Sequence, residues 1–81
     1  MDNKTKVIAV IEESLELTQP ITDTRLRFRE DLHADSVDMV SMGLLLEEAL
    51  SVDIDERQLQ TLLTVQDVID WIDQEAVDRQ A

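Results

Sequence analysis

The sequence predicts an all-α fold, a four-helix bundle of three longer helices and one short helix, with a long loop between the first and second helices. Hydrophobic residues make up 43% of the 81 residues and recur at helical spacing. A single glycine and a single proline leave little of the turn chemistry that a sheet requires. The length suits one small domain over residues 1–81.

The composition is strongly acidic, with 19 Asp and Glu against 7 Lys and Arg, a formal net charge of -12. Such a charge repels nucleic acid and anionic membranes and attracts basic protein surfaces. No apolar run is long enough to span a bilayer, and the first residues lack the order of a signal peptide. We therefore expect a cytoplasmic monomer that binds no nucleic acid and inserts into no membrane.

The first helix is expected from about Lys4 to Leu17, with Asn3 as its N-cap. Its apolar face at helical spacing consists of Val7, Ile8, Ile11 and Leu15. Pro20 ends any continuation, because the residue before a proline is disfavoured in the helical region.

Residues 18–35, "TQPITDTRLRFREDLHAD", form a connection longer than most helix–helix links. Apolar and basic residues alternate along it. The residues expected to plug the core are Leu26, Phe28 and Leu32, and those expected to stay in water are Arg25, Arg27 and Arg29. A short strand shows the same alternation, but no partner strand is visible. The segment is therefore interpreted as an anchored loop.

The second helix is expected to begin after Asp35 as N-cap, with Asp38 in its first turn, and to continue to about Leu50. At about 100° per residue, one apolar stripe contains Met39, Met42, Leu46, Ala49 and Leu50. A second stripe, roughly opposite, contains Val37, Val40 and Leu44. An ordinary surface helix has only one such stripe, so the second stripe indicates an additional role.

The third helix is expected over Glu56–Leu62, capped by Asp55, with Gln58 reaching back in a capping box. The fourth is expected after Thr64, with Asp67 at the box position. Its inward residues are Val65, Val68, Ile69 and Ile72, with Trp71 at the edge of that face. The tail from about residue 76 is expected to fray.

His33, Asp35 and Ser36 resemble the parts of a hydrolase triad. Asp35 would have to cap the helix and orient His33 at once, and there is no G-x-S-x-G elbow, so hydrolysis ranks last among the hypotheses for this chain. With one His and no Cys, and no calcium-loop spacing, no dedicated metal site is expected. Ser36 itself opens a helix, where free N–H groups and the helix dipole suit a phosphate-linked group.

The stretch "EDLHADSVDMV", residues 30–40, resembles the prosthetic-group motif of acyl carrier proteins, close to E-D-L-G-x-D-S-L-D. The matching residues are Glu30, Asp31, Leu32, Asp35, Ser36 and Asp38. Downstream, "LEEALSVDID" looks like the end of that family's second helix, and "LTVQDVIDWI" looks like the start of its fourth. The resemblance covers nearly the whole chain.

The resemblance implies that Ser36, beside Asp35, receives 4′-phosphopantetheine from coenzyme A through a separate phosphopantetheinyl transferase. The thiol of that group would hold acyl chains as thioesters, so the protein would be a carrier and not an enzyme. The implied partners are acyl-loading enzymes, a ketosynthase and other acyl-processing enzymes of fatty-acid or polyketide-type synthesis. The acyl chain can fold back into the bundle, where Leu46, Leu62 and Ile69 are expected to line the interior.

The second stripe then becomes a docking strip, Val37, Val40 and Leu44, with Ile54 from the following loop. No Lys or Arg occurs between residues 30 and 56, and the acidic residues of the rim include Asp38, Glu47 and Glu48. We expect basic patches on partner enzymes to bind here, steered by charge. The alternative is a solvated acidic face that carries a few apolar residues by chance.

Several residues depart from the family pattern. His33 occupies the usual glycine position, either as a loop residue or as a contact to the phosphate, and Val37 replaces a leucine. Gly43 weakens the middle of the helix, and Ser41 lacks an acidic charge often found there. These differences favour a dedicated pathway over a housekeeping role. A peptidyl or aminoacyl carrier, or an unmodified acidic helical adaptor, are the alternatives.

Overall fold

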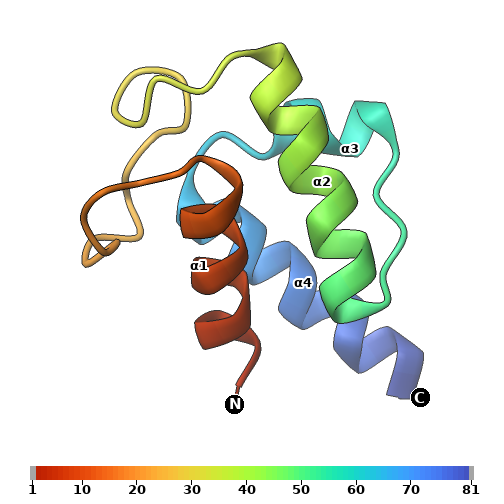
Figure 1. Ribbon diagram of the computed structural model, residues 1–81. Helices are drawn as coiled ribbons and strands as arrows, with labels where there is room; N and C mark the ends of the chain where they lie inside the picture. The colour runs from red at the N-terminus through yellow and green to blue at the C-terminus, as the bar shows by residue number, and fades with distance from the viewer. Residues whose placement is uncertain (1, 81) are drawn as a thin grey trace.

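A computed structural model describes the backbone of residues 2–80 and the side chains through Glu75. These residues form four α-helices and no strand, which confirms the all-α prediction (Figure 1). The helices are α1 (Asn3–Ser14), α2 (Ser36–Leu50), α3 (Glu56–Thr61) and α4 (Val65–Gln80).

The helices pack around one apolar core. α1 contacts both α2 and α4, and the short α3 contacts α2 (Figure 1). The largest fully buried side chains come from three helices and from the long loop: Val7, Ile11, Phe28, Met42, Leu46, Val65, Val68 and Ile72. The loop between α1 and α2 therefore contributes to the core as a helix does.

The two ends of α1 differ from the prediction. Asp2, and not Asn3, is the N-cap, and its carboxylate accepts a hydrogen bond from the Thr5 N–H at 2.8 Å. The helix ends at Ser14, three residues before the expected end, because Glu16 adopts a left-handed conformation with φ 51°. The Leu17 N–H then bonds the Glu12 carbonyl, as in a Schellman motif. No glycine marks this cap in the sequence.

α2 begins and ends where predicted, and Asp35 and Asp38 form a complete capping box. The inner face buries Met39, Met42, Gly43 and Leu46. The placement of Ala49 in this stripe is wrong, because in the last turn Leu50 packs against the core and Ala49 is exposed.

Gly43 packs against α3, and we expect its replacement by alanine to stabilise the protein. An added Cβ would lie 3.5 Å from the Leu59 methyl groups, an ordinary van der Waals distance. Gly43→Ala should therefore raise the free energy of unfolding by about 0.5–1 kcal/mol, the cost of glycine in a helix interior. Urea denaturation measures the change, with Ala9→Gly in α1 as the matched reverse substitution at an exposed position. A loss of stability would show that the two helices cannot accommodate the methyl group.

α3 is one residue shorter than expected, and its capping box is only half formed. Asp55 accepts the Gln58 N–H at 2.7 Å, but the Gln58 side chain donates to the Thr61 hydroxyl at 3.2 Å and does not return to the cap. α4 starts with a reciprocal pair between Thr64 and Asp67, each side chain accepting the other's N–H at 3.1 Å.

The apolar face of α4 lies as predicted. Its buried residues include Val65, Val68, Ile69 and Ile72, and Trp71 is half-buried at the edge. The helix continues to Gln80. Side chains from Ala76 onwards lie outside the described residues, so the fraying of the tail stays a prediction.

The loop is anchored, as the alternation predicted. Phe28 is only 1% exposed, while Leu26 and Leu32 pack against the core from half-buried positions. The Phe28 N–H donates to the Leu63 carbonyl at 3.0 Å, and the Val65 N–H to the Leu26 carbonyl at 3.1 Å. These bonds make a single antiparallel bridge between the loop and the start of α4.

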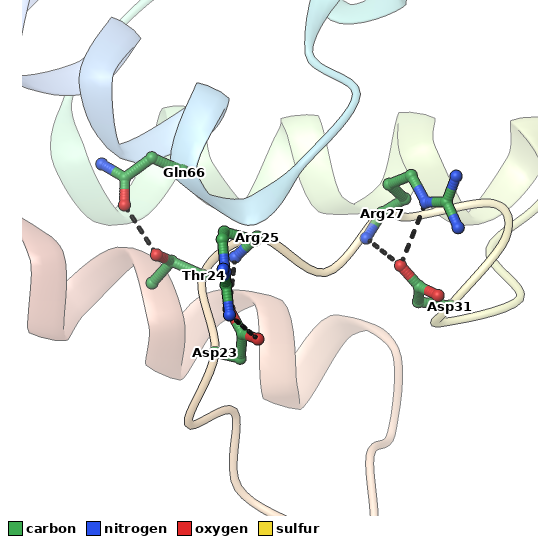
Figure 2. A network of polar contacts seen from close by, with 6 residues as sticks. All are labelled: Asp23, Thr24, Arg25, Arg27, Asp31 and Gln66. Carbon is green, nitrogen blue, oxygen red and sulfur yellow. Dashed lines mark hydrogen bonds and ion pairs between the residues drawn. The ribbon is translucent and has the colours of Figure 1, made fainter.

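A side-chain bond reinforces this bridge. The Thr24 hydroxyl donates to the Gln66 side-chain oxygen at 2.7 Å, and the Gln66 N–H donates to the Thr24 carbonyl at 2.7 Å. Figure 2 shows Thr24 and Gln66 facing each other from the loop and from α4. The loop is thus held at both its apolar and its polar residues.

Candidate functional site

Ser36 is the first residue of α2 and is exposed, as predicted. The Asp35 carboxylate accepts the Asp38 N–H at 2.8 Å, and the Asp38 carboxylate accepts the Asp35 N–H at 3.1 Å. Asp35 is therefore occupied as a helix cap. Ser36, in the first turn of this capped helix, therefore lies at the positive end of the helix dipole.

His33 is an exposed loop residue in the left-handed region, with φ 58°. Its backbone explains why glycine suits this position and why histidine is tolerated there. Within the described side chains, no hydrogen bond joins His33 to Asp35 or Ser36. The geometry therefore provides no triad, in agreement with the sequence analysis.

The segment before Ser36 is joined to Phe28 by a backbone hydrogen bond. The Ala34 N–H donates to the Phe28 carbonyl at 2.8 Å, so the buried ring fixes the point at which the chain enters α2. The Arg27 N–H and guanidinium both donate to Asp31, and these bonds lower the pKa of its carboxyl (Figure 2). Arg27 also pairs with Glu30.

Arg25 is paired in the same manner. Its guanidinium and its N–H donate to Asp23 and lower the pKa of that carboxyl (Figure 2). Two of the three exposed arginines of the loop are thus matched with carboxylates.

Arg29 behaves differently, and sequence reasoning missed its role. It is exposed, as expected, but its Nη2 donates to the Ser36 Oγ at 3.2 Å. The only signal in the sequence is a basic residue seven positions before the serine. That signal has meaning only once the loop is folded back on the start of α2.

A cavity of about 400 Å³ lies beside the serine, between the loop, α2 and α3. Arg29 and Ser36 are among its polar lining residues, and Phe28, Met39, Leu59 and Leu62 are among its apolar ones. Of the three residues predicted to line an interior space, Leu62 lines this cavity. Leu46 and Ile69 are buried in the core instead.

The docking strip is exposed along α2. Val37 is 72% exposed, Val40 50% and Leu44 57%, high values for apolar side chains on a folded protein. Of its rim, Glu48 is exposed and Asp38 is half-buried in the capping box. Val37, Val40, Leu44 and Glu48 follow one another at spacings of three and four residues, so they lie along one side of the helix.

Two residues assigned to this surface have structural roles as well. The Glu47 carboxylate accepts the Ile54 N–H at 3.3 Å, which ties the α2–α3 loop to α2. Ile54 is half-buried and packs against the core, so only part of its side chain can extend the strip.

Within the described residues, no cluster of His, Asp and Glu could hold a metal ion. None of the helices there has the length and apolar character of a membrane span.

The chain matches the family described as "Phosphopantetheine attachment site" over residues 5–72. It is 37% identical over 73 residues to an acyl carrier protein of Helicobacter hepaticus, and the aligned region covers 90% of this chain and 96% of that protein. It is 40% identical over 75 residues to an acyl carrier protein of Borreliella burgdorferi, covering 89% and 94%. The chain belongs to the acyl carrier protein family. The resemblance stated from the motif is thereby confirmed.

Membership establishes a covalently attached 4′-phosphopantetheine and a carrier role without catalysis. It also implies interaction with a phosphopantetheinyl transferase and with acyl-processing enzymes. The residues of the carrier fit such a group, because an exposed hydroxyl lies beside a cavity with an apolar wall large enough for part of a flexible chain.

Proposed function

We propose that Ser36 bears the 4′-phosphopantetheine and that the carrier transports acyl intermediates between enzymes of fatty-acid or polyketide-type synthesis. The observation that carries the proposal is the exposed Ser36 hydroxyl at the start of a capped helix, next to a 400 Å³ cavity. We further propose a cytoplasmic, single-domain monomer with a dedicated pathway of its own.

The attachment is a phosphoryl transfer. The Ser36 Oγ forms a bond to a phosphorus of coenzyme A, the pyrophosphate bond breaks, and 3′,5′-ADP leaves. The hydroxyl proton passes to a base on the transferase. The carrier supplies the exposed nucleophile, and the bound group supplies a thiol that forms thioesters with acyl chains.

The docking strip is proposed as the surface that partner enzymes bind. Its apolar residues are Val37, Val40 and Leu44, with part of Ile54, and its acidic rim consists of Asp38, Glu47 and Glu48. Charge attracts basic patches over a distance, and the small apolar area keeps each complex short-lived. A carrier that must visit several enzymes in turn requires this combination.

The test is the intact mass after incubation with coenzyme A and a broad-specificity phosphopantetheinyl transferase. The wild type and Ser41→Ala should gain one phosphopantetheine, because Ser41 is an exposed serine of the same helix that is not the proposed attachment point. Ser36→Ala should gain none. An unmodified wild type, beside a control carrier that is modified, would favour an acidic helical adaptor instead. A gain that persists in Ser36→Ala would place the attachment elsewhere.

A further inference from the structure

The attachment point poses an electrostatic problem. A phosphodiester is an anion, and on Ser36 it would join a surface that already contains Glu30, Asp35 and Asp38 in a chain of net charge -12. Helix N–H groups can offset part of this repulsion, but the Asp38 N–H is already bonded to Asp35. A further cation near Ser36 would be favourable.

Arg29 is placed to provide it. Its Nη2 lies 3.2 Å from the Ser36 Oγ, the atom that would become the ester oxygen. In the part of the chain with described side chains, Arg29 forms no ion pair with a carboxylate, whereas Arg25 and Arg27 do. A guanidinium has five N–H donors, so most of those on Arg29 remain for other acceptors.

The position of Arg29 is fixed by its neighbour. Phe28 is buried, its N–H bonds the Leu63 carbonyl, and its carbonyl accepts the Ala34 N–H. The backbone immediately before Arg29 is therefore anchored, although the Arg29 side chain itself is exposed. An anchored backbone reduces the entropy that the arginine must lose to make a contact.

We propose that Arg29 binds the phosphodiester that joins the 4′-phosphopantetheine to Ser36. The inference rests on the proposed attachment to Ser36 and adds a positioning residue to it. Arginine suits the task because its planar fork can make two parallel hydrogen bonds to phosphate oxygens. Since Arg29 and Ser36 both line the cavity, the arginine would hold the phosphate at the cavity and orient the attached arm toward the apolar wall.

The experiment compares the loaded carrier with its Arg29→Gln, Arg29→Lys and Arg25→Gln forms by ³¹P NMR of the phosphodiester. Arg29→Gln should shift the resonance, and Arg29→Lys should shift it less because the charge is kept. Arg25→Gln is the matched control, an exposed arginine of the same loop that pairs with Asp23, and it should leave the resonance unchanged.

A second readout is the melting temperature of each variant before and after loading. Arg29→Gln should lower the melting temperature of the loaded form by roughly 2–5 °C more than that of the unloaded form, as expected for an exposed ion pair in a small domain. The difference should shrink as salt is added.

The possible outcomes separate the two proposals. A wild type that gives no phosphodiester resonance overturns the attachment and the arginine contact together. A resonance that is present but identical in wild type and Arg29→Gln, with equal effects of loading on the melting temperature, overturns the role of Arg29 alone.

Discussion

Phe28→Ala is expected to lower the free energy of unfolding by about 3–5 kcal/mol. The ring is fully buried, with 1% of the residue exposed, and its removal would leave a cavity between the loop and the helices. The residue also carries the backbone bonds to Leu63 and Ala34. For a domain of this size, such a loss is a large fraction of the total stability of about 5–15 kcal/mol.

Urea denaturation measures this change, with Leu26→Ala as the control. Leu26 lies in the same loop but is half-buried, so its truncation should cost clearly less. A loss below about 1 kcal/mol for Phe28→Ala, against the range typical of buried aromatic truncations, would show that the loop is not part of the core. Phe28→Leu should recover part of the stability, because most of the apolar volume is kept.

Leu44→Glu is expected to reduce kcat/KM for modification by a phosphopantetheinyl transferase by about tenfold, the effect of losing one well-packed apolar contact in an interface. Leu44 is 57% exposed and belongs to the docking strip. The substitution places a charge where the partner would bury an apolar side chain, and it leaves Ser36 untouched.

The matched control is Ala9→Glu, which adds the same charge at an exposed position of α1. It should leave the rate within about twofold of the wild type, since it lies away from the docking strip and only a localised contact carries most of the binding energy. Both variants should melt close to the wild type, because neither position is buried. Equal rates for Leu44→Glu and wild type would contradict the proposed docking strip.

Local features of the sequence predicted the start of α2 and the candidate site. The N-cap Asp35, the first-turn Asp38 and the period of Met39, Met42 and Leu46 depend on residues within a few positions of each other. Such interactions form whenever the segment is helical, whatever packs against it. For the same reason the exposure of Val37, Val40 and Leu44 could be anticipated from the second stripe.

The end of α1 and the orientation of Ala49 were predicted wrongly for related reasons. Glu16 adopts a left-handed conformation that other residue types favour more strongly, and the period alone cannot tell how far along α2 the core extends. Gln58 had two possible partners at short range and bonds Thr61 instead of the cap. A competing local contact decided the partner of Gln58, and the extent of the core along α2 decided the exposure of Ala49.

The sequence by itself determined the helical class, the acidic surface, the capped start of α2 and the exposed serine, because these follow from short-range periodicity, capping and charge. Only the tertiary structure decided that the loop bridges to α4 at Arg27 and Thr64, that a cavity opens beside Ser36, and that Arg29 contacts the serine hydroxyl. These features join residues from different parts of the chain. The burial of Phe28 and the backbone hydrogen bonds between the loop and α4 bring those residues together. Contacts of that kind leave no periodic signal in the sequence.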